Sequence, residues 1–288
     1  MRHRAIKDLS QLSDSDLFLQ VAEGLNHIVK NAQEFYADSE SLATQLRGPG
    51  SRVLRTIAEE EAAKYLILID AIRCPRQSNN FSRQLGRFYF HLSRGIYAYA
   101  AIGQFSTLGE LRNWVNEECE SLFLNGPEGY DYIYRNRILD SRESMMYVDY
   151  ELHEDNEYIW SAPGHHNGGL ALGLRGVIPP SLATVHSLTK AGFATPQGLK
   201  LLADIWRPIS IIDTISRSDL QGYIQRTYEE ADNRALPGER DQITTTRLSQ
   251  YWQFPMYSLD MRLIEVSLDE LRDQRNNQWL SEFDNDYF

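Results

Sequence analysis

Apolar residues recur every three or four positions in the first part of the chain, and this spacing predicts long amphipathic helices. The stripe of the first predicted helix consists of Phe18, Val21, Leu25, Ile28, Ala32 and Phe35. The four helices predicted in this part cover residues 16–46, 52–72, 81–102 and 107–124. "GPGS" and "CPRQSNN" are predicted to separate the first three of them. Long helices joined by short loops favour an antiparallel bundle.

The pattern changes after residue 125. Residues 143–163, "ESMMYVDYELHEDNEYIWSAP", have β-branched and aromatic residues on both sides of a polar turn, which predicts a short β-hairpin or flap. The Gly- and Pro-rich residues 163–180 are predicted to form a loop. Helical patterns return after it, over residues 181–193, 195–206, 217–235, 239–253 and 257–283.

These elements predict a mainly α protein in two parts. Residues 1–163 form the helical domain with its β-hairpin, and residues 164–288 form an additional helical region that could pack on the first. The second part matches no pattern to which a function can be attached.

Composition narrows the class of protein. The chain has 288 residues, of which 42% are apolar, so it can bury a large core. A net charge of −11 disfavours broad non-specific binding of nucleic acid, although a local basic patch could still bind it. Two cysteines, no signal-peptide pattern and no apolar run of membrane-spanning length predict a soluble, cytoplasmic protein without a membrane partner.

The positive charge is concentrated locally. Residues 71–109 contain no Asp or Glu, and their arginines are Arg73, Arg76, Arg83, Arg87 and Arg94. Arg83, Arg87, His91 and Arg94 follow one another at spacings of four, four and three, so one helix would place them on one face. Guanidinium groups bind phosphate through paired donors, and an imidazole can transfer protons near neutral pH. The alternative is a solvated basic face that pairs with acids of the preceding helix.

Other motifs carry less information. Glu60 and Lys64 have the spacing of a helical ion pair, which is worth little when it is exposed. His153, His165 and His166 do not have the spacing of a metal site. The sequence has no Gly-rich phosphate loop, nucleophile elbow, HExxH or paired CxxC motif, so we expect neither a metal nor a cofactor.

Three segments, "AEGLNHIVKNAQEFYADSESL", "VLRTIAEEEAAKYLILIDAI" and "RESMMYVDYELHEDNEYIWSAP", together resemble one family. It is the AbiV family of bacterial abortive-infection proteins, which are similar to HEPN-type helical domains. Residues that match its motifs are Asn31-Ala32, Ala58, Glu60, Glu61, Lys64, His91, Arg142 and Tyr147-Val148-Asp149. The acid pair before Lys64 is either Glu59-Glu60 or Glu60-Glu61, which differ by one residue in their spacing to the lysine. The resemblance covers residues 15–163, and the order of the motifs makes it more specific than any one of them.

Two departures from the family pattern concern the chemistry. Arg94 stands where the family has the lysine of H-x-x-K. HEPN ribonucleases carry R-x4-6-H, whereas three residues separate Arg87 from His91 and seven separate Arg83 from His91. The resemblance therefore implies a HEPN-like bundle and leaves open whether the chain is an enzyme.

The resemblance implies a function in anti-phage defence that acts on RNA or translation, by RNA binding or by metal-independent cleavage, and a homodimer. If the second and third helices pack antiparallel, the acid orients the histidine and the cations receive a phosphate. The expected catalytic residues are His91, Arg87, Glu60 and Lys64, and the expected phosphate-binding residues are Arg83, Arg94, Arg76 and Arg73. Two alternatives remain open: a non-catalytic protein that senses a phage or host protein, and a nucleotide-binding helical domain.

Overall fold

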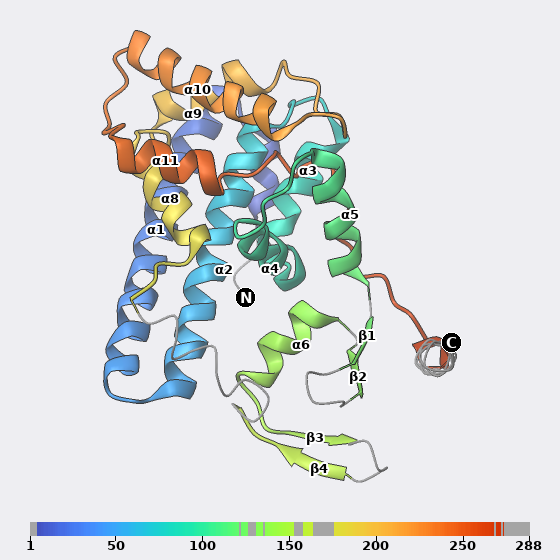
Figure 1. Ribbon diagram of the computed structural model, residues 1–288. Helices are drawn as coiled ribbons and strands as arrows, with labels where there is room; N and C mark the ends of the chain where they lie inside the picture. Colours follow the sequence, from blue (N-terminus) through green and yellow to red (C-terminus); the bar gives the residue numbers. More distant parts are fainter. Residues whose placement is uncertain are drawn as a thin grey trace, which may run out of the picture.

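The prediction of a mainly α protein is confirmed (Figure 1). The computed structural model describes residues 5–120, 122–125, 131–134, 136–152, 158–163, 176–267, 269–271 and 273. Within this part of the chain, no helix is long and apolar enough to cross a membrane.

The first two long helices form an antiparallel pair (Figure 1). After a short 3₁₀ helix, Ile6–Gln11, α1 runs over Asp14–Thr44 and α2 over Gly48–Arg73. The Ser13 hydroxyl accepts a hydrogen bond from the backbone N–H of Asp16 at 3.2 Å and so caps α1. "GPGS" begins α2 rather than separating the helices, because proline is compatible with a first helical turn.

The single helix predicted over residues 81–102 is wrong. The chain forms α3 (Asn79–Gly86), the 3₁₀ turn η2 (Arg87–Tyr89) and α4 (His91–Ala100). Phe90 is extended, with φ −96° and ψ 123°. The break separates Arg83 and Arg87 from His91 and Arg94, so the four side chains do not share one helical face.

The next elements connect the bundle to a projecting hairpin. In chain order they are α5 (Leu108–Cys119), β1 (Leu122–Asn125), β2 (Asp131–Tyr134), α6 (Arg137–Ser144), β3 (Asp149–Leu152) and β4 (Tyr158–Ser161). The helix predicted over 107–124 therefore ends early, and its last residues form β1, which pairs antiparallel with β2. The hairpin predicted within 143–163 is confirmed, because β3 pairs antiparallel with β4.

The C-terminal helices pack on the first pair or on one another. They are α8 (Pro180–Lys190), α9 (Pro196–Trp206), α10 (Arg217–Asn233) and α11 (Gln242–Tyr251), close to the predicted ranges. Both α8 and α9 contact α1 and α2. One hydrophobic core includes Leu17 and Ile69 from the N-terminal part together with Leu199 and Trp206 from the C-terminal part.

The helix predicted over residues 257–283 begins too early, because residues 257–267 contain no helix; the described residues 269–271 and 273 are helical. Residues 252–261, which we call the strap, contain no helix and run across the bundle with buried Trp252, Phe254 and Leu259. Proline at 255 interrupts any helical hydrogen bonding there. The aromatic and apolar side chains of the strap therefore close the core as an extended segment.

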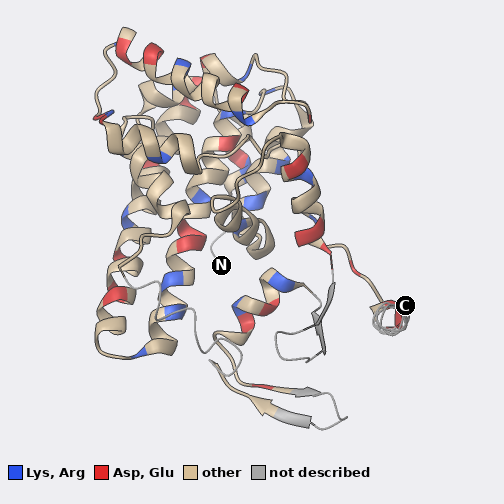
Figure 2. Ribbon diagram, in the orientation of Figure 1, with Lys and Arg blue, Asp and Glu red and all other residues tan. Residues whose placement is uncertain are grey.

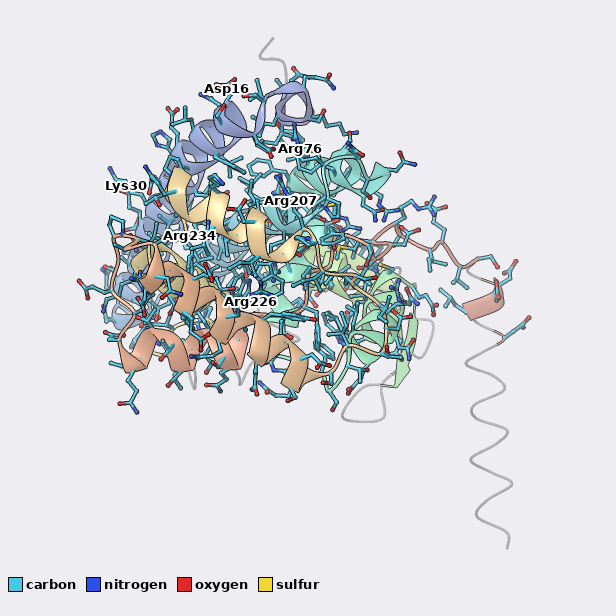
Figure 3. All side chains as sticks on the ribbon, turned by 90° about the horizontal axis from the view of Figure 1, so that it is seen from above. Asp16, Lys30, Arg76, Arg207, Arg226 and Arg234 are labelled. Carbon is cyan, nitrogen blue, oxygen red and sulfur yellow. The ribbon has the colours of Figure 1, made fainter. Side chains whose placement is uncertain are left out.

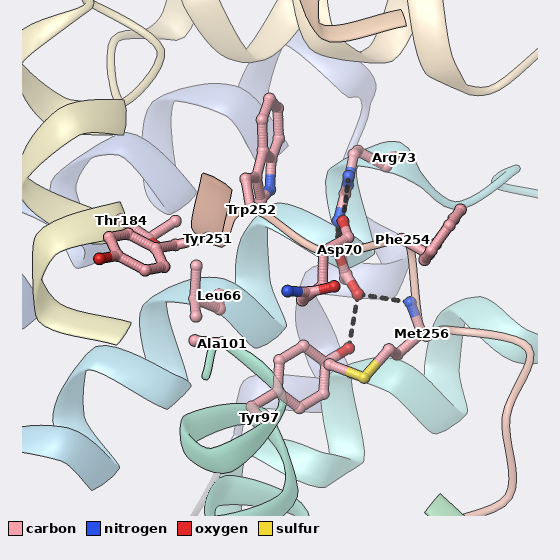
Figure 4. A pocket seen from close by; sticks show the side chains of 11 residues that line it. Leu66, Asp70, Arg73, Tyr97, Ala101, Thr184, Tyr251, Trp252, Phe254 and Met256 are labelled. Atoms are coloured by element: carbon pink, nitrogen blue, oxygen red, sulfur yellow. Dashed lines mark hydrogen bonds and ion pairs between the residues drawn. The ribbon is translucent and has the colours of Figure 1, made fainter. Parts of the chain in front are cut away.

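A buried carboxylate attaches the strap to the bundle (Figure 4). Asp70 of α2 accepts hydrogen bonds from the hydroxyl of Tyr97 at 2.6 Å and from the backbone N–H of Met256 at 2.8 Å, and it pairs with Arg73. The Arg73 guanidinium also lies 4.7 Å from the ring centre of Trp252. These contacts satisfy a charged pair within the core, where an unpaired charge would be costly.

Candidate functional site

Side chains from three separate helices meet at the carboxylate of Glu60, in the middle of α2. Its Oε2 lies 3.0 Å from Nδ1 of His91 and 3.2 Å from Nη1 of Arg94, both on α4. Its Oε1 accepts a hydrogen bond from Nε of Arg142, on α6, at 2.8 Å. One acid thus holds an imidazole and two guanidiniums in place.

The positions of α4 and α6 bring the three partners to Glu60. Arg94 donates its Nε–H to the carbonyl of Phe88 at 2.9 Å, which orients its guanidinium. Gly95 lets α6 approach, because a Cβ there would lie 2.2 Å from Cγ2 of Ile138. The Asn136 side chain caps α6 and donates to the carbonyl of Glu118 at 2.9 Å, so the helix carrying Arg142 is anchored at its start.

The imidazole is the most accessible group of the cluster. The side chain of His91 is 41% exposed, against 26% for Arg142, 13% for Glu60 and 11% for Arg94. A carboxylate on Nδ1 favours the tautomer with its proton on Nδ1, and Nε2 is then the basic nitrogen. No described residue forms a hydrogen bond with Nε2. His91 can therefore accept a proton from a molecule that enters from solvent.

A pocket opens beside this cluster, and we call it the Glu60 pocket. It is open to solvent, and the empty space of about 350 Å³ there includes part of that solvent. Its lining residues are Thr56, Glu59, Glu60, His91, Gly95, Ala98, Tyr99, Ile138, Arg142 and Met145. The pocket lies between α2, α4 and α6, and its lining includes a second carboxyl group, that of Glu59.

Glu59 has a different environment from Glu60. Burial raises the pKa of Glu59 to about 7, although Arg55 opposes the rise. Nε of Arg55 lies 3.5 Å from Oε1 of Glu59. Burial also raises the pKa of Tyr99 on the facing helix, and the Glu59 carboxyl adds to the rise. The pocket therefore contains one carboxyl group that is partly protonated near neutral pH.

The expected approach of Glu60 to His91 and Arg94 is confirmed by these contacts. Lys64, which was expected beside them, instead pairs with Glu61 and lies 5.5 Å from the ring centre of Phe88. It does not line the Glu60 pocket. Of the motif residues on α2, Glu60 therefore belongs to the site, whereas Lys64 contacts other residues.

Arg87 is not beside His91, contrary to the expectation. Its side chain is buried and donates to Oε1 of Gln84 at 2.6 Å, to the carbonyl of Met256 at 2.8 Å and to that of Leu259. A guanidinium whose donors are occupied by core carbonyls has no access to RNA. Arg87 fastens the strap, and the helix break at Phe90 separates it from the site.

The other expected phosphate contacts are also dispersed. Arg73 is buried against Asp70, and Arg83 donates to the carbonyls of Tyr257 and Ser258. Arg76 donates to the carbonyl of Leu12 at 2.6 Å, and Figure 3 shows it near Arg207 in the view from above. Of the expected phosphate-binding arginines, only Arg94 contacts Glu60. The single basic face was wrong because its helix is broken and its side chains bind protein carbonyls.

Three pocket residues with ionisable side chains, Glu59, Tyr99 and Arg142, were not among the expected site residues. Arg142 belongs to the R-x4-Y-V-D segment that supported the family resemblance, but nothing in its spacing places it at Glu60. Glu59 immediately precedes Glu60. Tyr99 had no signal of its own in the sequence.

Within the described residues, no group of three His, Cys, Asp or Glu side chains is arranged to hold a metal ion. His153, His165 and His166 lie outside the described residues.

Comparison of the chain with family models, with curated proteins and with solved structures finds no match. The resemblance to the AbiV family, and its HEPN-like character, therefore stay predictions.

Proposed function

We propose that this protein cleaves RNA at the Glu60 pocket by general acid–base catalysis, without a metal, in an anti-phage defence response. The observation that carries the proposal is the Glu60 carboxylate, which holds Nδ1 of His91 at 3.0 Å and binds Arg94 and Arg142 beside an open pocket. The defence context rests on the resemblance alone.

The arrangement suits the cleavage of a phosphodiester next to a ribose hydroxyl. Nε2 of His91 would accept the proton of the 2′-OH, and the 2′-oxygen would attack the adjacent phosphorus. The two guanidiniums would stabilise the negative charge that grows on the phosphoryl oxygens. Arg94 and Arg142 together carry one more charge than Glu60 balances, and Glu59 is paired with Arg55, so the site retains a net attraction for phosphate.

The distribution of charge favours a local rather than an extended contact with RNA. Figure 2 shows basic residues on α6 and on α2, whereas the whole chain has a net charge of −11. A long duplex would meet repulsion from most of the surface. We therefore expect a single-stranded segment to enter the Glu60 pocket, and we expect affinity to fall with salt.

The two guanidiniums beside the pocket support a second candidate function. Guanidiniums of Arg94 and Arg142 could hold the phosphate of a free nucleotide there. Nucleotide binding without RNA cleavage would favour this candidate, and a thermal shift with nucleotides but not with RNA would detect it.

The proposed cleavage is tested by incubating the purified protein with total RNA and tRNA in EDTA, followed by mapping of the ends. The key variant is His91→Ala, and the matched control is His27→Ala, whose side chain on α1 is 80% exposed. We expect wild type and His27→Ala to cut RNA, and His91→Ala to lose about 100-fold or more in rate. Intact RNA with wild type, or full activity of His91→Ala, would contradict the proposal.

The defence context and the assembly are tested separately. Cells that express His91→Ala should lose any protection against phage that wild type gives. The homodimer implied by the resemblance is tested by light scattering of the purified chain, and a phage or host protein partner by affinity capture during infection.

A further inference from the structure

Two consecutive glutamates reach the same pocket and have different partners. Glu60 is occupied by His91, Arg94 and Arg142. Glu59 also lines the pocket, and it pairs with Arg55, whose Nε lies 3.5 Å from Oε1 of Glu59. Neighbouring carboxyl groups in unlike environments commonly take unlike roles in proton transfer. Glu60 is used to orient the imidazole, which leaves Glu59 with no role in the chemistry described so far.

The charged and titratable groups around Glu59 come from three helices. Arg55 and Glu60 share α2 with it, His91 and Tyr99 belong to α4, and Arg142 belongs to α6. Burial raises the pKa of Glu59 to about 7, so a large share of it carries a proton at neutral pH. Burial also raises the pKa of Tyr99 from its ordinary value of 10.0. A tyrosine with such a pKa is a weak proton donor, so Glu59 is the better acid of the pocket.

We propose that Glu59 is the general acid of the RNA cleavage, which protonates the 5′-oxygen of the leaving nucleotide opposite His91. This inference rests on the proposed function. It follows from the position of Glu59 in the same pocket as His91 and Arg142, and from its having no cationic partner as close as those of Glu60.

The proposed step is balanced in protons and bonds. The 2′-oxygen gives its proton to Nε2 of His91 and forms a bond to phosphorus. The bond between phosphorus and the 5′-oxygen breaks, and that oxygen takes the proton of Glu59. The products are a 2′,3′-cyclic phosphate and a free 5′-hydroxyl. His91 is then protonated and Glu59 ionised, and exchange with water restores both.

The test compares two substrates that differ in their need for an acid. The first is a short single-stranded RNA. The second is uridine 3′-(4-nitrophenyl phosphate), whose 4-nitrophenolate leaves without a proton. We expect Glu59→Gln to lose about 100-fold or more on RNA and less than about threefold on the aryl ester. His91→Ala should lose activity on both, because both need the base.

A matched control distinguishes the loss of the Glu59 acid from the loss of a carboxylate that pairs with Arg55. Glu40 of α1 also contacts Arg55, at 3.5 Å, and it does not line the pocket. Glu40→Gln should therefore retain wild-type rates on both substrates. In addition, the RNA cleavage rate of wild type should fall above about pH 7 as Glu59 ionises, and Glu59→Gln should lack this alkaline limb.

The outcomes separate this inference from the proposed function. Equal losses of Glu59→Gln on the two substrates, or no loss on RNA, would overturn the role of Glu59 while His91→Ala still confirmed the site. Failure of wild type to cleave either substrate would overturn the proposed function and this inference together.

Discussion

The stability of the fold should depend on pH through Glu59, whether or not the protein is an enzyme. Burial raises the pKa of this carboxyl from 4.5 to about 7 in the folded state. Below pH 4.5 this carboxyl is protonated in both the folded and the unfolded states, so its burial does not lower the free energy of unfolding through ionisation. Between pH 4.5 and 7 the unfolded state ionises first, so the free energy of unfolding falls as pH rises.

The size of the effect follows from the same shift. The difference between 4.5 and about 7 corresponds to at most about 3 kcal/mol. The Glu59 side chain is 25% exposed, and solvent screening there reduces the expected effect to roughly 1–2 kcal/mol. Glu59→Gln replaces the acid by a neutral group of the same shape, so it should remove the cost of ionisation at neutral and alkaline pH.

Urea denaturation of wild type and Glu59→Gln from pH 4.5 to 8.5 measures the difference. We expect the variant to match wild type at the acidic end and to gain roughly 1–2 kcal/mol over it by pH 8. Glu34→Gln, at an α1 side chain that is 64% exposed, is the control for loss of a surface carboxylate. If the difference between Glu59→Gln and wild type did not change with pH, the carboxyl would not be buried as described.

Two further pairs of variants test the packing around the site and the strap. Arg87→Ala leaves buried carbonyls of the strap unsatisfied, so it should lower the free energy of unfolding in urea by about 3 kcal/mol. Arg83→Ala, at an exposed residue, should lower it far less. Equal losses in the two variants would contradict the assignment of Arg87 to the core. Gly95→Ala places a Cβ 2.2 Å from Cγ2 of Ile138 and should cost about 2 kcal/mol and reduce cleavage by displacing α6. At Gly24 an added Cβ meets nothing within 4 Å, so Gly24→Ala should stabilise the protein by about 1 kcal/mol in thermal unfolding. If Gly95→Ala also stabilised the protein, the close packing of α4 on α6 would be contradicted.

The helices that pack locally could be predicted from the sequence. The apolar spacing from Phe18 to Phe35 gives α1 within a few residues, because a helix of that length shows several periods of its buried stripe. The hairpin within 143–163 was also predictable, since alternating aromatic residues on both sides of a polar turn are typical of paired strands.

The helix break at Phe90 could not be predicted from the local sequence. Residues 81–102 have no proline, and the spacing of Arg83, Arg87, His91 and Arg94 fits a continuous helix. Arg87 instead binds the carbonyls of Met256 and Leu259, which lie far along the chain. A contact between residues so far apart in the sequence does not affect the local spacing of apolar residues, so that spacing could not reveal it. By contrast, Pro255 marked the break between the helices predicted over 239–253 and 257–283, although the second of these was placed too early.

The candidate site was predictable in part. The packing expected between the second and third predicted helices brings Glu60 to His91 and Arg94, although in the structure the contact is made by α4 alone, after the break at Phe90. The arrival of Arg142 depends on α6, a helix that was not predicted, and on the small Gly95 that lets α6 approach. Only the family resemblance linked Arg142 to the other motif residues before the fold was known.

The central claim is that His91, held by Glu60, removes the proton of a 2′-hydroxyl. It is tested most directly with a DNA oligonucleotide that contains one ribonucleotide, incubated with the protein in EDTA and analysed by mass spectrometry. We predict a cut only after the ribonucleotide, with a 2′,3′-cyclic phosphate on one product and a 5′-hydroxyl on the other, and no cut with His91→Ala. An intact oligonucleotide, or a cut that leaves a 3′-hydroxyl, would contradict this account.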